Sequence, residues 1–243
     1  MKETLVIIPT FNESENVELI IKALLDPYMD LHVLVVDDNS PDGTAGIVSD
    51  LQKDYAERLH LEVRQSKDGL GTAYIHGFKW ALARNYQFIF EMDADFSHNP
   101  EDVPILYKAC VENDADLVIG SRYVTGVNVV NWPMSRVLMS YFASKYVQWI
   151  TRMTIKDTTA GFVCYRSSLL RKINLDKIKF IGYAFQIELK FKAHLLKAKI
   201  IEIPVIFTDR SRGKSKMHGG IIQEAITGVL FMKIKSLFGT LQI

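Results

Sequence analysis

The first half of the chain alternates short, unbroken apolar runs with segments in which apolar residues recur at helical spacing. The run at 5–8 is rich in β-branched side chains and is stopped by Pro9, which is typical of a strand buried on both faces. Between Val17 and Leu25 the apolar residues form the single stripe of an amphipathic helix. Buried strands that alternate with helices build parallel sheets. The chain is therefore predicted to be an α/β protein with an open, mostly parallel sheet and helices on both faces.

This alternation continues to about residue 121 and then changes. Further strands are predicted at 32–36, near Leu61, at 88–92 and at 117–120, and further helices at 44–55, 71–85 and 99–113. Beyond Arg122 we expect a long apolar and aromatic helix at 134–153, a strand at 161–165, a helix at 184–198 and a strand at 200–204. The chain is thus predicted to form one domain over 1–218 and an apolar or amphipathic helical tail over 219–243.

Composition and charge exclude several classes of protein. With 29 Lys and Arg against 28 Asp and Glu, the net charge of +1 argues against a nucleic-acid partner. A hydrophobic fraction of 48% with 23% charged residues excludes disorder of the whole chain. No segment has the roughly 20 apolar residues of a transmembrane helix, and the start lacks a secretory signal, so we expect folding in the cytosol. Cys110 and Cys164 lack metal-site spacing and are predicted to be reduced, buried thiols.

Three polar clusters come directly after predicted strands, at 9–13, 37–40 and 93–98. Ligands of open parallel sheets bind outside the carboxyl ends of the strands, so these clusters should share one edge of the sheet. Asp93 and Asp95 are spaced so that both carboxylates can reach one divalent cation. The same Asp-Ala-Asp triplet recurs at 114–116, but it precedes its strand and should lie at the opposite edge, where it is interpreted as a solvated turn.

The first two clusters favour a nucleotide, but not one bound as in a dehydrogenase. Asp37 and Asp38 follow the second strand, where an acidic residue commonly bonds a ribose hydroxyl. The turn at 9–13 lacks the glycines that let a backbone approach a pyrophosphate, so a Rossmann dehydrogenase is excluded. The diphosphate would be held by the cation and by basic residues, for which the run at 210–216 is the candidate.

Six motifs follow one another along the chain: Ile8-Pro9-Thr10-Phe11-Asn12-Glu13, Asp37-Asp38-Asn39-Ser40-Pro41-Asp42-Gly43-Thr44, Gly69-Leu70-Gly71-Thr72-Ala73, Asp93-Ala94-Asp95, Gly120-Ser121-Arg122 and Arg210-Ser211-Arg212-Gly213-Lys214-Ser215-Lys216. Taken together, they resemble the dolichol-phosphate (polyprenol-phosphate) mannose synthases of glycosyltransferase family 2, and the likeness covers nearly the whole chain. The resemblance implies a GT-A fold with a Rossmann-like nucleotide-binding half, GDP-mannose as donor, Mg or Mn as cofactor, and transfer of mannose with inversion to a polyprenyl (dolichyl-type) monophosphate.

The resemblance also implies a role for individual residues. Catalytic roles fall to Asp95, Arg122 and Arg210. The metal would be held by Asp93, Asp95 and Ser97, where microbial relatives often carry Gln in place of the serine. The acceptor phosphate would be met by Arg122, Arg136 and Ser140. The donor would be bound by Pro9, Phe11, Glu13, Val36, Asp38, Asp93, Ala94, Asp95, Arg122, Arg210 and Lys216.

The chemistry implied by the resemblance needs no obligatory base. A lipid monophosphate has a second pKa of about 6, so it is already largely an anionic nucleophile near neutral pH. Charge on the leaving diphosphate would be stabilised by the metal, Arg210 and Lys216. Two alternatives stay open: a family 2 transferase of glucose or another sugar to undecaprenyl phosphate, and a sugar-nucleotide-binding protein without turnover. A sugar-1-phosphate nucleotidylyltransferase is disfavoured because 9–13 lacks its glycine-rich signature.

The lipid acceptor implies a membrane surface as a partner. The helix at 134–153 and the tail from Gly219 have apolar faces flanked by Lys and Arg, so either could lie along a membrane or simply pack on the sheet. The predicted location is cytoplasmic, peripheral at the inner face of the cytoplasmic membrane. The sequence leaves open a membrane-anchoring subunit as a further partner.

Overall fold

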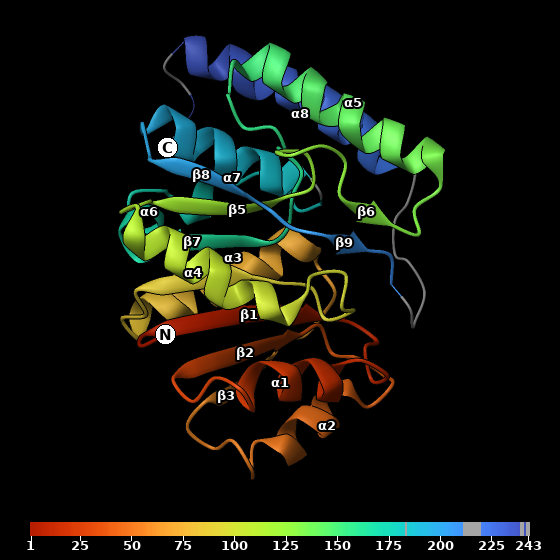
Figure 1. Cartoon of the computed structure of the whole chain (residues 1–243), viewed down its shortest axis with the longest axis vertical. Coiled ribbons are helices and arrows are strands. Elements are labelled where there is room, and N and C mark those ends of the chain that lie inside the picture. The colour runs from red at the N-terminus through yellow and green to blue at the C-terminus, as the bar shows by residue number, and fades with distance from the viewer. Residues whose placement is uncertain (183, 211–219, 239–240, 242–243) are drawn as a thin grey trace.

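A seven-stranded sheet in the order β3-β2-β1-β4-β7-β5-β8 forms the centre of the molecule (Figure 1). The computed structural model describes residues 1–182, 184–210, 220–238 and 241, with the backbone alone for 220–226. A small parallel pair is made by β6 (Val129–Val130) and β9 (Phe207–Thr208). The central strands are β1 (Thr4–Thr10), β2 (Leu31–Asp37), β3 (Leu59–Val63), β4 (Phe88–Glu91), β5 (Leu117–Ser121), β7 (Val163–Arg166) and β8 (Ile200–Pro204).

The sheet is parallel except at one strand. β1 pairs in parallel with β2 and β4, and β5 pairs in parallel with β8. β7 lies between β4 and β5 and is antiparallel to both. The prediction of a mostly parallel sheet is therefore confirmed. Because β7 is reversed, the segment that enters it reaches the edge at which the parallel strands end.

Helices cover both faces of the sheet, as the alternation predicted. Along β1, Val6 and Ile8 belong to the core under one set of helices, and Leu5 and Ile7 to the core under the other. The first set comprises α1 (Val17–Leu25), α2 (Thr44–Leu51) and α4 (Val103–Glu112). The second comprises α3 (Leu70–Ala83) and α7 (Ala184–Leu195), with α5 (Met134–Thr151) and α8 (Gly220–Leu237) beyond them. Short helical turns complete the chain at η1 (Pro100–Asp102), α6 (Ser167–Leu170) and η2 (Leu175–Lys177).

α7 is the most enclosed helix of the second layer. Every residue from Ala184 to Ala193 is buried, including two lysines, because the sheet lies on one side and α8 packs on another. Val147 of α5 and Val229 of α8 join the same core. Figure 1 shows α5 and α8 side by side beyond α7. The predicted boundary between 218 and 219 falls outside the described residues, so the division into domain and tail stays a prediction.

The outer helices expose apolar side chains. Within the part of the chain that the structure describes, no helix combines the length and hydropathy of a membrane span. α5 exposes Met134, Leu138, Phe142 and Trp149 along one stripe, and α8 exposes Leu230, Phe231, Ile234 and Leu237. Both cysteines are free and buried, as predicted.

Candidate active site

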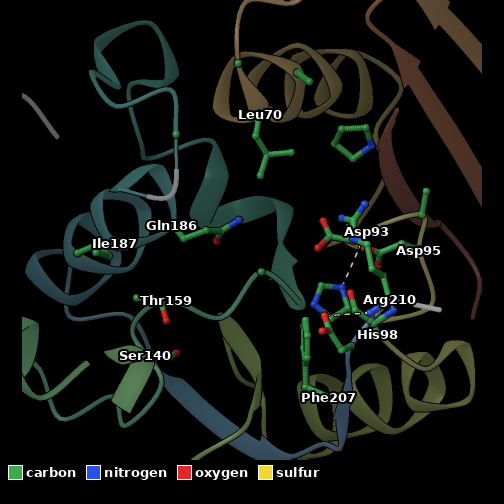
Figure 2. A pocket seen from close by; sticks show the side chains of 18 of the residues that line it. Leu70, Asp93, Asp95, His98, Ser140, Thr159, Gln186, Ile187, Phe207 and Arg210 are labelled. Carbon is green, nitrogen blue, oxygen red and sulfur yellow. Dashed lines mark hydrogen bonds and ion pairs between the residues drawn. The ribbon is translucent and has the colours of Figure 1, made fainter. Parts of the chain in front are cut away.

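A cavity of about 900 Å³ opens at the edge where the parallel strands end. Its walls come from segments far apart in the sequence: the ends of β1, β2 and β4, the segment entering β7, helix α5 and the chain after β9 (Figures 1 and 2). The predicted residues that line it are Pro9, Phe11, Glu13, Asp38, Asp93, Ala94, Asp95, Ser97, Arg136, Ser140 and Arg210. The three polar clusters thus share one edge, as the sequence predicted.

Three predicted residues are not among those that line the cavity. Val36 is fully buried within β2. Arg122 is buried behind the wall and is described below. Lys216 lies outside the described residues, together with the rest of the basic run after Arg210, so its role stays a prediction.

The end of the cavity formed by β1 and β2 carries an acidic residue held by an arginine. Arg64 Nε donates to Asp38 Oδ1 at 2.6 Å, and Arg64 Nη1 donates to Thr72 Oγ1 at 2.8 Å. Burial raises the pKa of the Asp38 carboxyl, and the Arg64 guanidinium opposes that rise. Lys67 lies over the ring of Phe11, 4.3 Å from its centroid. A planar polar group, such as a nucleobase, would find an apolar ring and hydrogen-bonding groups here.

Asp37, unlike Asp38, has a structural role. Its Oδ1 accepts hydrogen bonds from Thr10 Oγ1 at 2.7 Å and Ser40 Oγ at 2.6 Å, and its Oδ2 accepts from Ser40 N–H at 2.8 Å. Asp37 therefore ties the ends of β1 and β2 together, while Asp38 faces the cavity. Consecutive residues of a strand end point to opposite sides, so the pair divides into one structural and one cavity-lining carboxylate.

Asp93, Asp95 and Ser97 bring three oxygen donors to the end of β4. Asp95 Oδ1 accepts from Ser97 N–H at 3.1 Å, and Asp95 Oδ2 pairs with Arg210 Nη2 at 2.7 Å (Figure 2). The Ser97 hydroxyl oxygen is buried without a hydrogen-bond partner among the described residues. Two carboxylates and an unsatisfied hydroxyl fit a hard cation such as Mg or Mn. Since no group of three acidic, His or Cys residues forms a metal site in the described chain, an ion would need further oxygens from a ligand or water.

His98 holds the loop that carries these donors. Its Nδ1 accepts the Asp93 backbone N–H at 3.1 Å, which requires that nitrogen to be unprotonated. Burial lowers the pKa of His98 to about 4, so the ring is neutral at physiological pH. The imidazole also stacks on Phe162, with centroids 5.1 Å apart. His98 is thus a positioning residue for the acidic loop.

Arg122 is engaged by the segment that enters β7. Its Nε and Nη2 donate to the two carboxylate oxygens of Asp157 at 2.7 Å each, and Nη2 also donates to Thr159 Oγ1 at 2.8 Å. Asp157 N–H is in turn bound by Glu202 Oε1 at 2.9 Å. Arg122 therefore reaches the cavity through Thr159, which lines it. Direct contact of Arg122 with two phosphates stays a prediction.

The α5 side of the cavity is basic at one end and apolar beyond it. Arg136 pairs with Asp209 at 2.8 Å and lies over Trp132, 4.0 Å from the ring centroid. Ser140 lines the cavity on the next turn of the helix. The wall continues with Met139, Phe142, Ala143, Tyr146 and Val147. A phosphate attached to a long apolar chain matches this succession of surfaces.

Sequence reasoning missed Lys67, Asp157, Thr159 and Gln186. Lys67 lies in a polar loop, and nothing in its neighbourhood distinguishes it from a solvated lysine. Asp157 and Thr159 precede a strand, and in an all-parallel sheet that would place them away from the site. The sequence does mark Gln186 as a candidate, because this polar residue is flanked by the apolar residues Phe185 and Ile187 on a predicted helix.

The second Asp-Ala-Asp triplet is where the prediction placed it, at the other edge of the sheet. The Asp114 side chain is 91% exposed and pairs with Arg166 at 3.0 Å. Asp116 Oδ2 accepts from Lys199 N–H at 2.8 Å. Both carboxylates therefore serve local structure, and the position of a triplet relative to its strand separated the two copies correctly.

Comparison with known proteins agrees with this architecture. The family described as Glycosyl transferase family 2 matches residues 5–178. An undecaprenyl-phosphate mannosyltransferase of Micrococcus luteus is 46% identical over 93% of this chain and 91% of its own length. A polyprenol monophosphomannose synthase of Mycolicibacterium smegmatis is 45% identical over 93% of this chain and 84% of its own.

Solved structures share the fold at lower identity. Glucosyl-3-phosphoglycerate synthase from Mycobacterium tuberculosis, in complex with Mn2+, UDP-glucose and phosphoglyceric acid, superposes with a TM-score of 0.64. It is 16% identical, and the match covers 97% of this chain and 79% of that one. A mycobacterial protein of known structure gives a TM-score of 0.68 at 16% identity, covering 95% of this chain and 74% of that one.

Proposed function

The chain belongs to glycosyltransferase family 2, and on that premise we propose that it transfers mannose from GDP-mannose to a polyprenyl monophosphate with inversion. Family and structural neighbours agree on the GT-A fold, which confirms the fold predicted from the sequence. The names of both relatives, at 45% and 46% identity, support mannose and a polyprenyl acceptor. One observation carries the proposal: a single cavity joins an acidic edge to a basic and then apolar wall.

In this proposal the acidic edge binds the donor diphosphate with a divalent ion. Asp93, Asp95 and Ser97 would hold Mg or Mn, which when bound neutralises charge on the leaving group. A structural neighbour that contains Mn2+ and a nucleotide sugar supports such an ion. Phe11 and Asp38 would hold the nucleoside, and Arg210, which already lies at this edge, would contact the diphosphate.

The acceptor phosphate would lie at Arg136 and Ser140, with its prenyl chain along α5. An ionised phosphate oxygen attacks the anomeric carbon as the bond to the diphosphate breaks, and the sugar ends with inverted configuration. Because that oxygen carries no proton near neutral pH, no side chain has to remove one. The chain contributes by orientation and by opposing the charge of two anions held close together.

The lipid acceptor places the reaction at a membrane. We propose a peripheral location at the inner face of the cytoplasmic membrane, reached through the exposed apolar stripes of α5 and α8. An anchoring subunit would be needed only if those stripes are insufficient.

The experiment that tests this function offers the enzyme several donors separately. Purified protein is incubated with Mg or Mn, polyprenyl phosphate and one labelled nucleotide sugar, and label is counted in the organic phase. Label from GDP-mannose that requires the lipid supports the proposal. Label from a UDP sugar alone would refute mannose as the natural sugar, and no lipid-dependent label from any donor would refute transfer itself.

A further inference from the structure

Gln186, at the start of α7, has no part in the function described so far. The residue is only 2% exposed, yet it lines the cavity. Its amide nitrogen Nε2 has no hydrogen-bond partner among the described residues. An amide donor that is buried without a protein partner is costly, so the group calls for water or a ligand to satisfy it. Figure 2 shows the side chain reaching from the wall opposite Asp93 toward the middle of the cavity.

Lys190, one helical turn later, fixes which end of the amide faces the cavity. Its ammonium donates to Ala160 O at 2.7 Å, Gln186 Oε1 at 3.2 Å and Gln186 O at 3.4 Å. An ammonium group has three N–H donors and no acceptor, so the three oxygens satisfy it and the amide oxygen must face Lys190. The amide nitrogen is therefore held on the other side.

Glu91 is the other neighbour of this amide. Burial raises the pKa of the Glu91 carboxyl, while Lys190 and the Gln186 amide oppose the rise, so the amide lies near that carboxyl. An amide nitrogen carries two N–H donors. Glu91 Oε1 is also buried without a hydrogen-bond partner among the described residues, so it can take one of these N–H groups, which leaves the second for a group that enters the cavity.

Gly161 provides the space beside the amide nitrogen. A Cβ built on this glycine would lie 4.0 Å from Gln186 Nε2 and 3.7 Å from His98 Cε1, in ordinary van der Waals contact. A heavy atom therefore fits above Gly161 without displacing the protein. A ligand oxygen that enters this space needs to move about 1 Å closer to reach hydrogen-bonding distance of Nε2.

We infer that Gln186 binds a hydroxyl of the transferred sugar through Nε2, with Lys190 as its positioning residue and Gly161 keeping the space open. This inference rests on the proposed function. A neutral amide suits a neutral hydroxyl, whereas the cavity meets its anions with Arg136 and Arg210. The sugar passes from the donor diphosphate to the acceptor phosphate and must lie between them. Gln186 lies across the cavity from Asp93, on the side of Ser140 and Thr159, and its amide points toward the space between the two sides (Figure 2).

The test compares a nucleotide sugar with the same nucleotide without its sugar. Dissociation constants for GDP-mannose and GDP are measured by calorimetry with Mg on the full chain. Gln186→Met keeps the buried volume but removes the amide. It should lower the affinity for GDP-mannose by about 2- to 12-fold, as expected for one neutral hydrogen bond. The affinity for GDP should change by less than about twofold. Lys190→Met should have the same selective effect, because it frees the amide to turn.

Two further variants sharpen the result. Gly161→Ala places a methyl group in the open space. It should lower the affinity for GDP-mannose and leave the affinity for GDP unchanged. Gln52→Ala is the matched control, since Gln52 Nε2 already donates to Leu59 O at 3.0 Å, away from the cavity. Gln52→Ala should leave both affinities unchanged. Thermal unfolding of each variant shows whether the fold is retained.

The outcomes separate this inference from the proposed function. If Gln186→Met binds GDP-mannose as tightly as the wild type does, or loses affinity for GDP as much as for GDP-mannose, Gln186 is not a sugar contact. If only the KM for the lipid phosphate changes, the residue serves the acceptor and the inference is overturned. If the wild-type protein binds UDP-glucose and not GDP-mannose, the proposed donor is wrong. The same comparison made with UDP-glucose and UDP then decides the role of Gln186.

Discussion

Asp95 meets two demands with one carboxylate. Oδ1 accepts the Ser97 N–H, and Oδ2 pairs with Arg210 at 2.7 Å. The same group is a proposed metal ligand, so a bound ion and Arg210 compete for it. The pair keeps a buried carboxylate neutralised when no ion is present, which is the usual requirement for a charge that is 6% exposed.

Asp95→Asn is expected to lower the rate of transfer by at least about 100-fold, because an amide is a poor ligand for a hard cation and does not neutralise Arg210. The melting temperature should change little. Initial rates are measured by the organic-phase assay over a range of Mg and Mn concentrations.

The chain supplies its own control for this substitution. Asp114→Asn changes the same residue type in the same triplet at the opposite edge, where the side chain is 91% exposed. It should transfer mannose at the wild-type rate. An Asp95→Asn enzyme that keeps full activity with metal present would exclude the acidic edge as the metal site.

Single residues were predictable where a motif ties chemistry to position. Asp38, Asp93 and Asp95 follow strand ends, and the direction of a strand determines which edge it ends on. Arg122 was not predictable in the same way. Its guanidinium is bound by Asp157, a residue that is near only because β7 runs backward.

At the scale of elements, α5 and α8 are helices with two different faces. Val147 and Val229 are buried against the core, while Trp149 is 67% and Phe231 49% exposed. Exposed Lys145 lies in the same stripe of α5. Apolar stripes with lysines beside them match the composition of helices that lie in a membrane interface.

We therefore expect the protein to pellet with liposomes that contain anionic lipids. The double variant Trp149→Ser, Phe231→Ser should reduce the bound fraction by about tenfold or more, since each large apolar side chain contributes roughly 1.5–3 kcal/mol when buried. Ile105→Ser on α4, where Ile105 is 50% exposed, is the control and should bind like the wild type. Equal pelleting of all three proteins would contradict a role for these stripes.

Periodicity predicted that these elements exist but not how they pair. The helix predicted at 44–55 ends at Leu51, and the one predicted at 184–198 ends at Leu195, because periodicity locates a helix better than it locates the end of a helix. The direction of β7 was not predictable, because a short apolar run is compatible with both parallel and antiparallel pairing. Its partners are set by contacts with β4 and β5, which are distant in the sequence.

At the scale of the whole molecule, a cluster of rings joins the edge of the sheet to the chain before β4. His32 Nδ1 lies 2.7 Å from Tyr86 Oη, which lies 3.3 Å from His60 Nε2. Burial lowers the pKa of His60 to about 4, helped by His32 and Arg84. Burial also lowers the pKa of His32, helped by Arg58 and opposed by Asp30 and Glu57.

These shifts predict that the folded protein loses stability in acid. Both histidines have a lower pKa when folded than the ordinary value near 6.5, so the unfolded chain takes up protons first. The contribution of the two histidines to the free energy of unfolding is fully present above about pH 6.5. It declines as the pH falls toward about 4, the pKa of His60 in the folded protein. For His60 the slope stays below about 1.4 kcal/mol per pH unit, because solvent screening reduces it, and His32 adds to it in the same direction.

Urea unfolding between pH 4 and 7 measures this dependence. His60→Phe keeps an aromatic ring against Trp80 and should flatten part of the slope between pH 6.5 and the folded value of about 4. An identical slope in the variant would show that other groups cause the acid sensitivity.

The overall plan of the molecule was largely available from the sequence, and the cavity was not. Alternating strands and helices predicted the layers and the edge where Asp38 and Asp95 meet. The far wall depends on α5 and α7 crossing the second face, and no local pattern encodes such a crossing. Gln186 and Arg136 come together only through that tertiary arrangement.

The antiparallel strand β7 lies between two parts of the sheet that contribute different walls of the cavity. Strands β1 to β4 supply the nucleotide side, and β5, β8 and α5 supply the side assigned to the lipid, with 157–161 as the seam between them. The two parts nevertheless share one core, in which Ile7 and Phe78 of the first part join Val163 and Phe185 of the second. A change of acceptor would have to replace side chains along α5 and 157–161, while the strand ends that carry Asp38 and Asp95 stay in place.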